Sequence, residues 1–176
     1  MWEDSPVTDA RAETEREPDF PPVKGGVNAI AVRAAESEVN MRDERCIFCK
    51  IANGEIPSNT LYEDEKYRVI LDLGPATKGH ALILPKDHYE NLYELPDENG
   101  AEVLRLAKQM AVRMKEKLGC TGMNLVQNNG ESAGQTVHHF HMHLIPRYDD
   151  GSRIVTWTPG EPSAEELAQI RDTICG

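Results

Sequence analysis

Short apolar runs separated by polar turns fill the middle of the chain, and this pattern predicts strands. The segment TLYEDEKYRVILDL (60–73) indicates two short strands around an acidic turn. GHALILPKDH (79–88) indicates a third strand that ends at Pro85, and GMNLVQN (122–128) indicates a fourth. A loop, NNGESAGQT (128–136), then precedes a last strand that is rich in histidine.

Two segments show helical periodicity instead. From about Asp97 to Leu118, apolar residues recur at helical spacing, and Gly119 is suited to end that helix. The segment PSAEELAQIRDTI (162–174) predicts a C-terminal helix with Ser163 and Glu166 at capping-box spacing. Strands and helices in this order predict an α+β fold with an antiparallel sheet, one long helix and a C-terminal helix.

The segment HHFHMHLIPRY (138–148) contains four of the six histidines. From His139 onward, histidines alternate with apolar residues, so a strand would direct three imidazoles to one face and Phe140, Met142 and Leu144 to the other. His138 directly precedes His139, so its side chain would point to the other face of the strand, and it is interpreted as scaffold. Pro146 is expected to limit how far the strand runs.

Three histidines in one register indicate a metal site or a catalytic site rather than a merely exposed polar face. Same-face neighbours on a strand are about 6.6 Å apart, so the first and third are about 13 Å apart. Ligands at about 2.0–2.1 Å from one zinc ion cannot come from both ends of that row. Two neighbours with help from elsewhere, or a central nucleophile with oriented imidazoles beside it, remain possible.

Composition limits the function classes. The chain has 176 residues and a net charge of −11, which suits one domain and disfavours a nucleic-acid backbone as partner. No apolar run is long enough to span a bilayer and the N-terminus lacks a signal-peptide pattern, so a cytoplasmic protein is expected. Residues 1–40 are acidic and poor in large apolar residues, and are predicted to be a disordered tail apart from a short helix at 27–39. The working domain is then 41–176, and Met41 is a candidate for the natural start.

Two further motifs carry chemistry. In NNGESAGQT, glycines allow close approach of the backbone to an anion, and hydroxyls and amides can hold phosphate oxygens next to the histidines. Cys46 and Cys49 form a single CxxC pair, which is either a redox pair or half of a zinc site. No βαβ setting for a redox motif is evident. The remaining zinc ligands would come from His80, His88 or one of the alternating histidines.

These motifs together resemble the histidine triad (HIT) superfamily. GQTVHHFHMHLIPR contains its His-φ-His-φ-His-φ-φ signature, where φ is apolar, and CIFCKIANGEIPSNTLYEDE, KGHALILPKDH and NNGESAGQTV are similar to further blocks of its bacterial Hint-like branch. The similarity extends from Cys46 to Tyr148. It implies the HIT-like fold, a homodimer, and binding of a purine nucleotide or nucleotidyl conjugate. From the net charge and the lack of a long apolar run, no nucleic acid and no membrane is expected as partner.

The resemblance also implies residue roles. His141 would attack the α-phosphate of a nucleoside phosphoramidate or related nucleotidyl conjugate, and water would then release the nucleotide from the histidine. The catalytic set is completed by His143, Thr136 and His80. The nucleotide-binding set would be Ile47, Phe48, Ile51, Ile70, Asp72, Leu73, Asn128, Gly134, Gln135, Thr136, Val137, His141 and His143. A structural zinc, not needed for the chemistry, would be held by Cys46, Cys49, His88 and His139.

Two other functions remain open from the sequence. One is a dinucleoside polyphosphate hydrolase, because Thr136 also occurs in that branch of the family. The other is a nucleotide-binding interaction module that needs no turnover.

Overall fold

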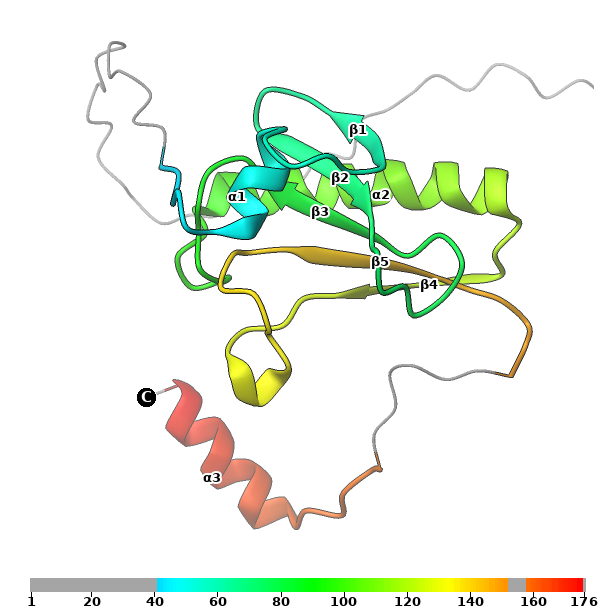
Figure 1. Ribbon diagram of the computed structural model, residues 1–176. Coiled ribbons are helices and arrows are strands. Elements are labelled where there is room, and N and C mark those ends of the chain that lie inside the picture. The colour runs from blue at the N-terminus through cyan, green and yellow to red at the C-terminus, as the bar shows by residue number, and fades with distance from the viewer. Residues whose placement is uncertain (1–40, 152–157, 176) are drawn as a thin grey trace, which may run out of the picture. The chain divides into compact units, whose positions relative to one another are not determined.

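Five strands form one antiparallel sheet in the computed structural model, which describes residues 41–151 and 158–175 (Figure 1). The strand order is β1-β2-β3-β5-β4, so β1 and β4 are the edges and β5 lies beside β3 through a crossover. The strands are β1 (Thr60–Glu63), β2 (Tyr67–Leu71), β3 (Ala81–Pro85), β4 (Gly122–Val126) and β5 (Met142–Arg147). The predicted α+β fold with an antiparallel sheet is confirmed.

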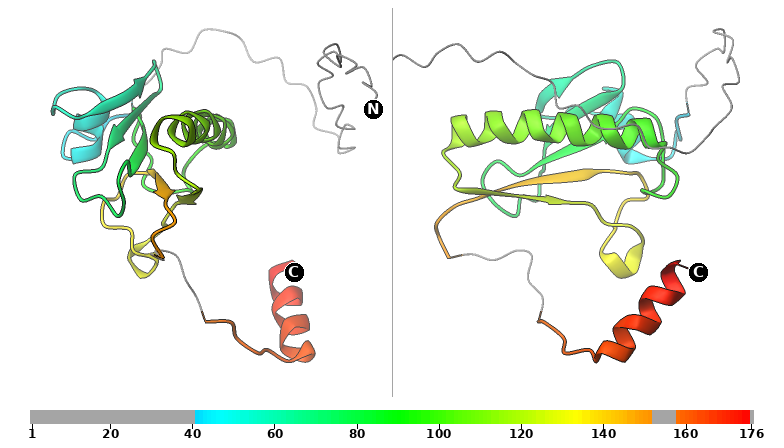
Figure 2. Two further views of the ribbon diagram at one scale, coloured as in Figure 1. Left: turned by 90° about the vertical axis from the view of Figure 1, so that its right-hand side faces the viewer. Right: turned by 180° about the vertical axis from the view of Figure 1, so that it is seen from behind.

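Two helices lie on opposite faces of this sheet, as Figure 2 shows from the side. The long helix α2 (Asp97–Leu118) has the bounds that its periodicity predicts, and Gly119 ends it in the left-handed conformation with φ 65°. The short helix α1 (Ile47–Ala52) was not predicted. Its N-cap is Cys46, whose sulfur accepts a hydrogen bond from the backbone N–H of Cys49 at 3.4 Å.

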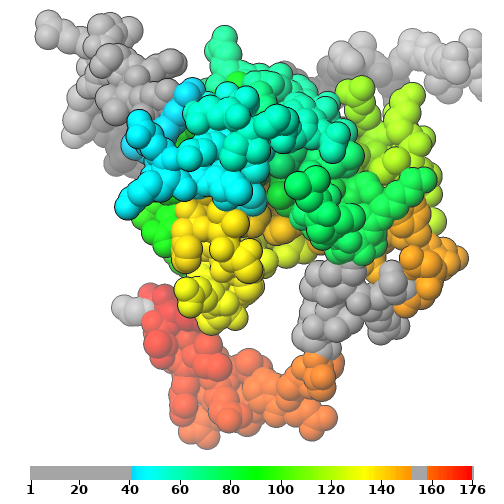
Figure 3. All heavy atoms as spheres, in the orientation of Figure 1, coloured from blue at the N-terminus to red at the C-terminus, as the bar shows by residue number. Residues whose placement is uncertain are grey.

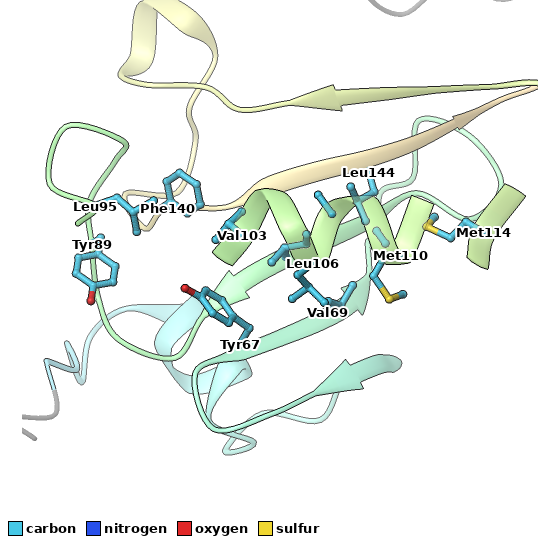
Figure 4. Packing of buried hydrophobic residues seen from close by; sticks show 13 residues of the cluster. Tyr67, Val69, Tyr89, Leu95, Val103, Leu106, Met110, Met114, Phe140 and Leu144 are labelled. Atoms are coloured by element: carbon cyan, nitrogen blue, oxygen red, sulfur yellow. The ribbon is translucent and has the colours of Figure 1, made fainter. Parts of the chain in front are cut away.

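The face of the sheet under α2 holds the main core (Figure 4). Val103, Leu106 and Met110 on α2 pack against the sheet, where Val69 of β2 and Leu144 of β5 are fully buried. Every second residue of β2 and β3 belongs to this core, because successive side chains on a strand point to opposite faces. The methionines of α2 are therefore core residues, as the helical spacing predicts.

The opposite face carries a smaller apolar cluster beneath α1. Ile70 of β2 and Leu82 and Leu84 of β3 are buried there, and Phe48 and Ile51 of α1 pack against them. Strand β3 is buried on both faces, which explains why its sequence is continuously apolar rather than alternating. Helix α1 packs against β3 on this face, near the end of the strand that leads to His88.

The histidine strand begins later than the sequence predicts. Only His143 of the three alternating histidines lies in β5, whose pairing with β3 starts at Met142 opposite Ile83. The ladder cannot extend past Pro85 in the ordinary way because proline has no N–H to donate. Upstream of β5 the backbone bends at 137–139, and the Phe140 N–H donates to the Tyr89 carbonyl at 2.6 Å. The rings of His139 and His141 nevertheless both contact Phe48 of α1.

Pro146 lies close to the end of its strand, as expected, although it is not the last residue. β5 runs through Pro146 to Arg147, and Pro146 pairs with Met123 of β4. Pairing with β3 stops at Leu144, so beyond it β5 has a strand partner on one side only. A residue without an N–H is tolerated where one side of a strand is unpaired.

The C-terminal helix α3 (Ala164–Cys175) begins with the predicted capping box. The Glu166 side chain accepts from the Ser163 N–H at 2.7 Å, and the Ser163 hydroxyl accepts from the Glu166 N–H at 3.2 Å. The predicted tail 1–40 and the helix at 27–39 lie outside the described residues. Within 41–151 and 158–175, every helix is too short or too polar to cross a bilayer.

Two leucines on α2 test the assignment of its buried face. Replacing the buried Leu106 with alanine removes core contacts and leaves a cavity, so we expect the free energy of unfolding to fall by about 2–5 kcal/mol. The same substitution at Leu104, which is 57% exposed on the same helix, should change it by less than about 0.5 kcal/mol. Urea denaturation of both variants measures the difference, and equal losses would contradict the assigned face.

Candidate functional site

The three alternating histidines lie on the face of the sheet that α1 covers. In Figure 3, α1 (cyan) adjoins the loop before β5 (yellow) on this face. The Phe48 ring meets the ring of His139 edge-on at 6.0 Å and that of His141 at 5.1 Å between centroids. The rings of His141 and His143 follow each other at 5.0 Å. The predicted row of imidazoles on one face is therefore present.

His139 is the most buried of the three, with no exposed surface. Its Nε2–H donates to the Pro85 carbonyl at 3.1 Å, which leaves the lone pair of Nδ1 on the other side of the ring. That Nδ1 lies 3.5 Å from the sulfur of Cys46 and 3.5 Å from the sulfur of Cys49. The Pro85 carbonyl thus fixes the tautomer in which His139 presents a ligand nitrogen to both sulfurs.

His88 completes a four-residue cluster with Cys46, Cys49 and His139. Its Nδ1 lies 3.4 Å from the Cys49 sulfur, and one donor atom from each of the four residues lies within 4.8 Å of all the others. A tetrahedral zinc with Zn–S of about 2.3 Å and Zn–N of about 2.0–2.1 Å sets its sulfur and nitrogen ligands about 3.5 Å apart. The donor set and the spacing therefore fit a tetrahedral metal ion without rearrangement of the backbone.

His141 is held differently. Its Nδ1–H donates to the backbone carbonyl of His139 at 2.7 Å, so its Nε2 carries the free lone pair. Burial lowers the pKa of His141 below the ordinary imidazole value, which keeps the ring neutral near pH 7. A neutral imidazole with a bare, oriented Nε2 is a nucleophile or a base.

His143 and His80 form a second pair of rings. His80 Nε2 lies 2.9 Å from His143 Nδ1, and the Ala76 N–H donates to His80 Nδ1 at 3.0 Å. Burial lowers the pKa of His80, and burial with the neighbouring His141 and His80 lowers the pKa of His143 to about 4. The carboxylate of Asp72 stands 3.7 Å from His80 Nε2.

The loop before the histidines is fixed by one buried side chain. The Gln135 carboxamide accepts from the Gly130 N–H at 2.8 Å and donates to the carbonyls of Glu90 and Val137 at 2.7 and 3.1 Å. Gly130 and Gly134 have φ of 81° and 88°, a conformation that glycine adopts at little cost. Gln135 is thus tied to the backbone, while Thr136 is exposed beside Cys46 and Ile47 in a cavity of about 760 Å³.

The residues predicted for a nucleoside lie around α1 and the end of β2. Phe48, Ile51 and Ile70 pack together in the smaller apolar cluster. Ile47 and Leu73 are 50% and 90% exposed, so each can contact a ligand only at the surface. His138 points away from the row and pairs with Glu90 at 3.2 Å, in keeping with its interpretation as scaffold. Each of the four cysteines carries a free thiol.

Two functional groups were missed because they are backbone atoms. The Pro85 carbonyl and the Ala76 N–H each set a histidine tautomer, and no side-chain motif marks them. Pro85 itself was recognisable as the end of a strand. Its carbonyl, however, meets His139 only through the pairing of β3 with β5.

Replacing Gln135 with alanine tests whether this side chain holds the loop. The change breaks three part-buried hydrogen bonds, each worth about 1 kcal/mol, so the free energy of unfolding should fall by about 3 kcal/mol. Gln109→Ala on the exposed side of α2 is the matched control and should have little effect. Urea unfolding curves report both values; a Gln135 variant as stable as its control would refute the role.

Comparison with known proteins agrees with this geometry. The HIT domain family matches residues 53–150. An uncharacterised HIT-like protein of Methanocaldococcus jannaschii is 44% identical over 131 residues, which are 74% of this chain and 99% of the relative. An adenosine 5'-monophosphoramidase of Saccharomyces cerevisiae is 42% identical over 129 residues, 73% of this chain and 79% of the relative.

Solved structures give the same result. The crystal structure of a HIT family protein from Bacillus anthracis superposes with a TM-score of 0.70 at 40% identity, covering 75% of this chain and 96% of that one. A zinc-bound histidine triad family protein from Mycobacterium smegmatis has a TM-score of 0.59 at 33% identity, with 73% and 96% covered. The sheet, the row of histidines and these matches lead to one conclusion: the chain belongs to the HIT domain family.

Proposed function

We propose that this protein is a nucleotide hydrolase that cleaves adenosine 5'-phosphoramidates or related nucleotidyl conjugates. The observation that carries the proposal is the hydrogen bond from His141 Nδ1–H to the His139 carbonyl, which leaves Nε2 of a buried neutral ring bare. The similarity to a yeast protein named adenosine 5'-monophosphoramidase supports the substrate class. Imidazole is a good nucleophile near neutral pH, and the phosphorus–nitrogen bond that it forms is labile enough for turnover.

The reaction proceeds in two displacements at the α-phosphorus. His141 Nε2 forms a bond to phosphorus while the bond to the leaving nitrogen breaks, and that nitrogen takes up a proton from solvent. Water then attacks the nucleotidyl-histidine and gives up a proton to solvent, the phosphorus–nitrogen bond to His141 breaks, and the nucleotide leaves with neutral His141 restored. The resemblance places the Thr136 hydroxyl near the leaving atom; in the structure Thr136 lines the cavity beside Cys46 and Ile47. His143 lies next to the proposed nucleophile.

Nucleotide binding follows from the surrounding groups. Asp72 is half-buried beside His80 and would accept two hydrogen bonds from ribose hydroxyls. Apolar side chains near α1 and the end of β2 would contact the base: Ile47, Phe48, Ile51, Ile70 and Leu73. The backbone N–H groups of the loop, with Asn128, Gly134, Gln135 and Val137, would hold phosphate oxygens. The side chain of Gln135 is already occupied. Its backbone N–H donates to the Gly130 carbonyl at 3.1 Å, so Gln135 would contribute by fixing the shape of the loop.

We also propose that Cys46, Cys49, His88 and His139 hold a structural zinc. The four donor atoms fit a tetrahedral ion, and a zinc-bound relative has the same fold. When bound, the ion would fasten α1 to the end of β3 and to the histidine segment, and it would supply no chemistry to the reaction. His141 belongs to neither metal-compatible group of donors among the described residues.

A cytoplasmic homodimer is the assembly that we propose. In the described part of the chain, β4 pairs with β5 alone, so its outer edge is free to pair with another strand. Leu125 on this strand is 44% exposed. The four free thiols agree with a reducing compartment.

Hydrolysis of an adenosine phosphoramidate tests the nucleophile. The wild-type protein should release AMP. His141→Ala should lose at least about 1,000-fold in kcat because the substitution removes the imidazole nucleophile. His138→Ala is the matched control, since His138 lies three residues away and faces Glu90 instead of the row; it should keep wild-type activity.

Diadenosine triphosphate is tested as a second substrate in the same hydrolysis assay. Slower turnover of this dinucleotide than of the phosphoramidate is expected, and faster turnover would move the protein to the dinucleoside polyphosphate branch. If neither substrate turns over, the protein is a nucleotide-binding module. Full activity of His141→Ala would show that another group is the nucleophile.

Metal analysis of the purified protein tests the zinc site. Wild type should contain about one zinc per chain, and Cys49→Ala should lose it together with thermal stability, because two sulfurs and two nitrogens form the closed site. Cys175→Ala, at an exposed cysteine outside the cluster, should keep the metal. A Cys49 variant with unchanged zinc content would refute the assignment.

A further inference from the structure

A backbone amide determines which nitrogen of His80 carries the hydrogen. The Ala76 N–H donates to His80 Nδ1 at 3.0 Å, so this nitrogen must offer its lone pair. A neutral imidazole has one N–H, and burial lowers the pKa of His80, which keeps the ring neutral. The hydrogen of His80 therefore lies on Nε2.

The hydrogen on His80 Nε2 in turn determines the tautomer of His143. His80 Nε2 is 2.9 Å from His143 Nδ1, and since Nε2 carries the hydrogen, it is the donor and His143 Nδ1 is the acceptor. The single hydrogen of neutral His143 is then on its own Nε2. We infer that His80 is a positioning residue that holds His143 in the Nε2–H tautomer, so that His143 acts on the substrate as a hydrogen-bond donor.

This tautomer makes neighbouring rings complementary. His141 donates through Nδ1 to the His139 carbonyl and offers a bare Nε2, whereas His143 offers an Nε2–H. Their centroids are 5.0 Å apart. In the proposed function, on which this inference rests, the lone pair attacks phosphorus while the N–H stabilises the negative charge that develops on a phosphoryl oxygen or on the leaving atom.

A metal ion is the competing explanation for the same residues. Donor atoms of Asp72, His80 and His143 lie within 4.8 Å of one another. A metal on His80 Nε2 would need the lone pair there and would move the hydrogen to Nδ1, where it would face the Ala76 N–H. Two donors directed at each other are unfavourable, so the arrangement supports a proton between the rings.

The segment that carries His80 is itself held closed by backbone hydrogen bonds. The Asp72 N–H donates to the His80 carbonyl at 3.0 Å, and the His80 N–H donates to the Thr77 carbonyl at 3.1 Å. The Thr77 hydroxyl donates to the Pro146 carbonyl on β5 at 2.7 Å. The proposed ribose ligand and the residue that orients His143 therefore belong to one short loop anchored on the histidine strand.

Two substitutions at His80 separate donation from packing. In His80→Gln the side-chain amide nitrogen reaches the position of Nε2 and can still donate to His143. In His80→Asn the shorter side chain can accept from Ala76 but does not reach His143. We expect kcat for the phosphoramidate to fall about 10–100-fold in the Asn variant, the range typical when the partner that orients a functional imidazole is removed. KM should change little. The fall in log kcat in His80→Gln should be at most about half of the fall in His80→Asn.

Nitrogen-15 NMR of the histidine rings gives a readout that is independent of turnover. In the wild type, His143 should show a protonated Nε2 and a bare Nδ1, assigned by comparison with His143→Gln. In His80→Asn its two tautomers should mix, and in His80→Gln the wild-type pattern should return. The protein is measured as the full chain, with circular dichroism to confirm that each variant is folded.

Each outcome decides the inference. An Nδ1–H tautomer of His143 in the wild type, or equal losses in the Gln and Asn variants, would overturn it. A wild type that turns over no substrate but shows the expected tautomer would refute the proposed function and leave the hydrogen-bond assignment standing. Unchanged kcat in the Asn variant would show that the orientation of His143 does not depend on His80.

Discussion

The site depends most on how one buried residue, His139, is held. Its ring nitrogens join the Pro85 carbonyl at the end of β3 to the two cysteine sulfurs around α1, and its own carbonyl accepts from His141. A single residue thus links the metal-compatible cluster to the bare nitrogen of the nucleophile. A shift of the His139 backbone would alter both at once. The proposed structural metal and the proposed metal-independent reaction can therefore share one short segment.

Apolar residues and histidines alternate in this segment, so its two faces have different neighbours. Phe140, Met142 and Leu144 belong to the core under α2, and the imidazoles between them face α1. Large apolar side chains on one face fix the direction of every imidazole on the other, because slipping by one residue would exchange the faces. The hydrophobic core therefore positions the row of imidazoles as well as stabilising the fold.

Much of this was predictable from sequence because periodicity reports faces directly. The bounds of α2 follow from period 3.6, and the common face of the three histidines follows from period 2. Strand β3 was recognised differently, as a short continuous apolar run that ends at Pro85. The start of β5 at Met142 did not follow, since it depends on which residue of β3 lies opposite. Helix α1 was missed because six residues are too few to show a helical period. The resemblance names the histidines and the side chains near them. The contact of the Pro85 carbonyl with His139, in contrast, joins segments 54 residues apart and became visible only in the fold.

The claim that His141 becomes covalently attached to the nucleotide is tested most directly by trapping the intermediate. The protein is mixed with an adenosine phosphoramidate, quenched rapidly in alkali to preserve a phosphorus–nitrogen bond, digested, and examined by mass spectrometry. The account predicts one adenylyl group on the peptide that contains His139 to Arg147, with fragmentation that places it on His141 and no adduct in His141→Ala. An adenylyl group on a different residue, or rapid turnover with no adduct at any quench time and inversion of configuration at phosphorus, would contradict it.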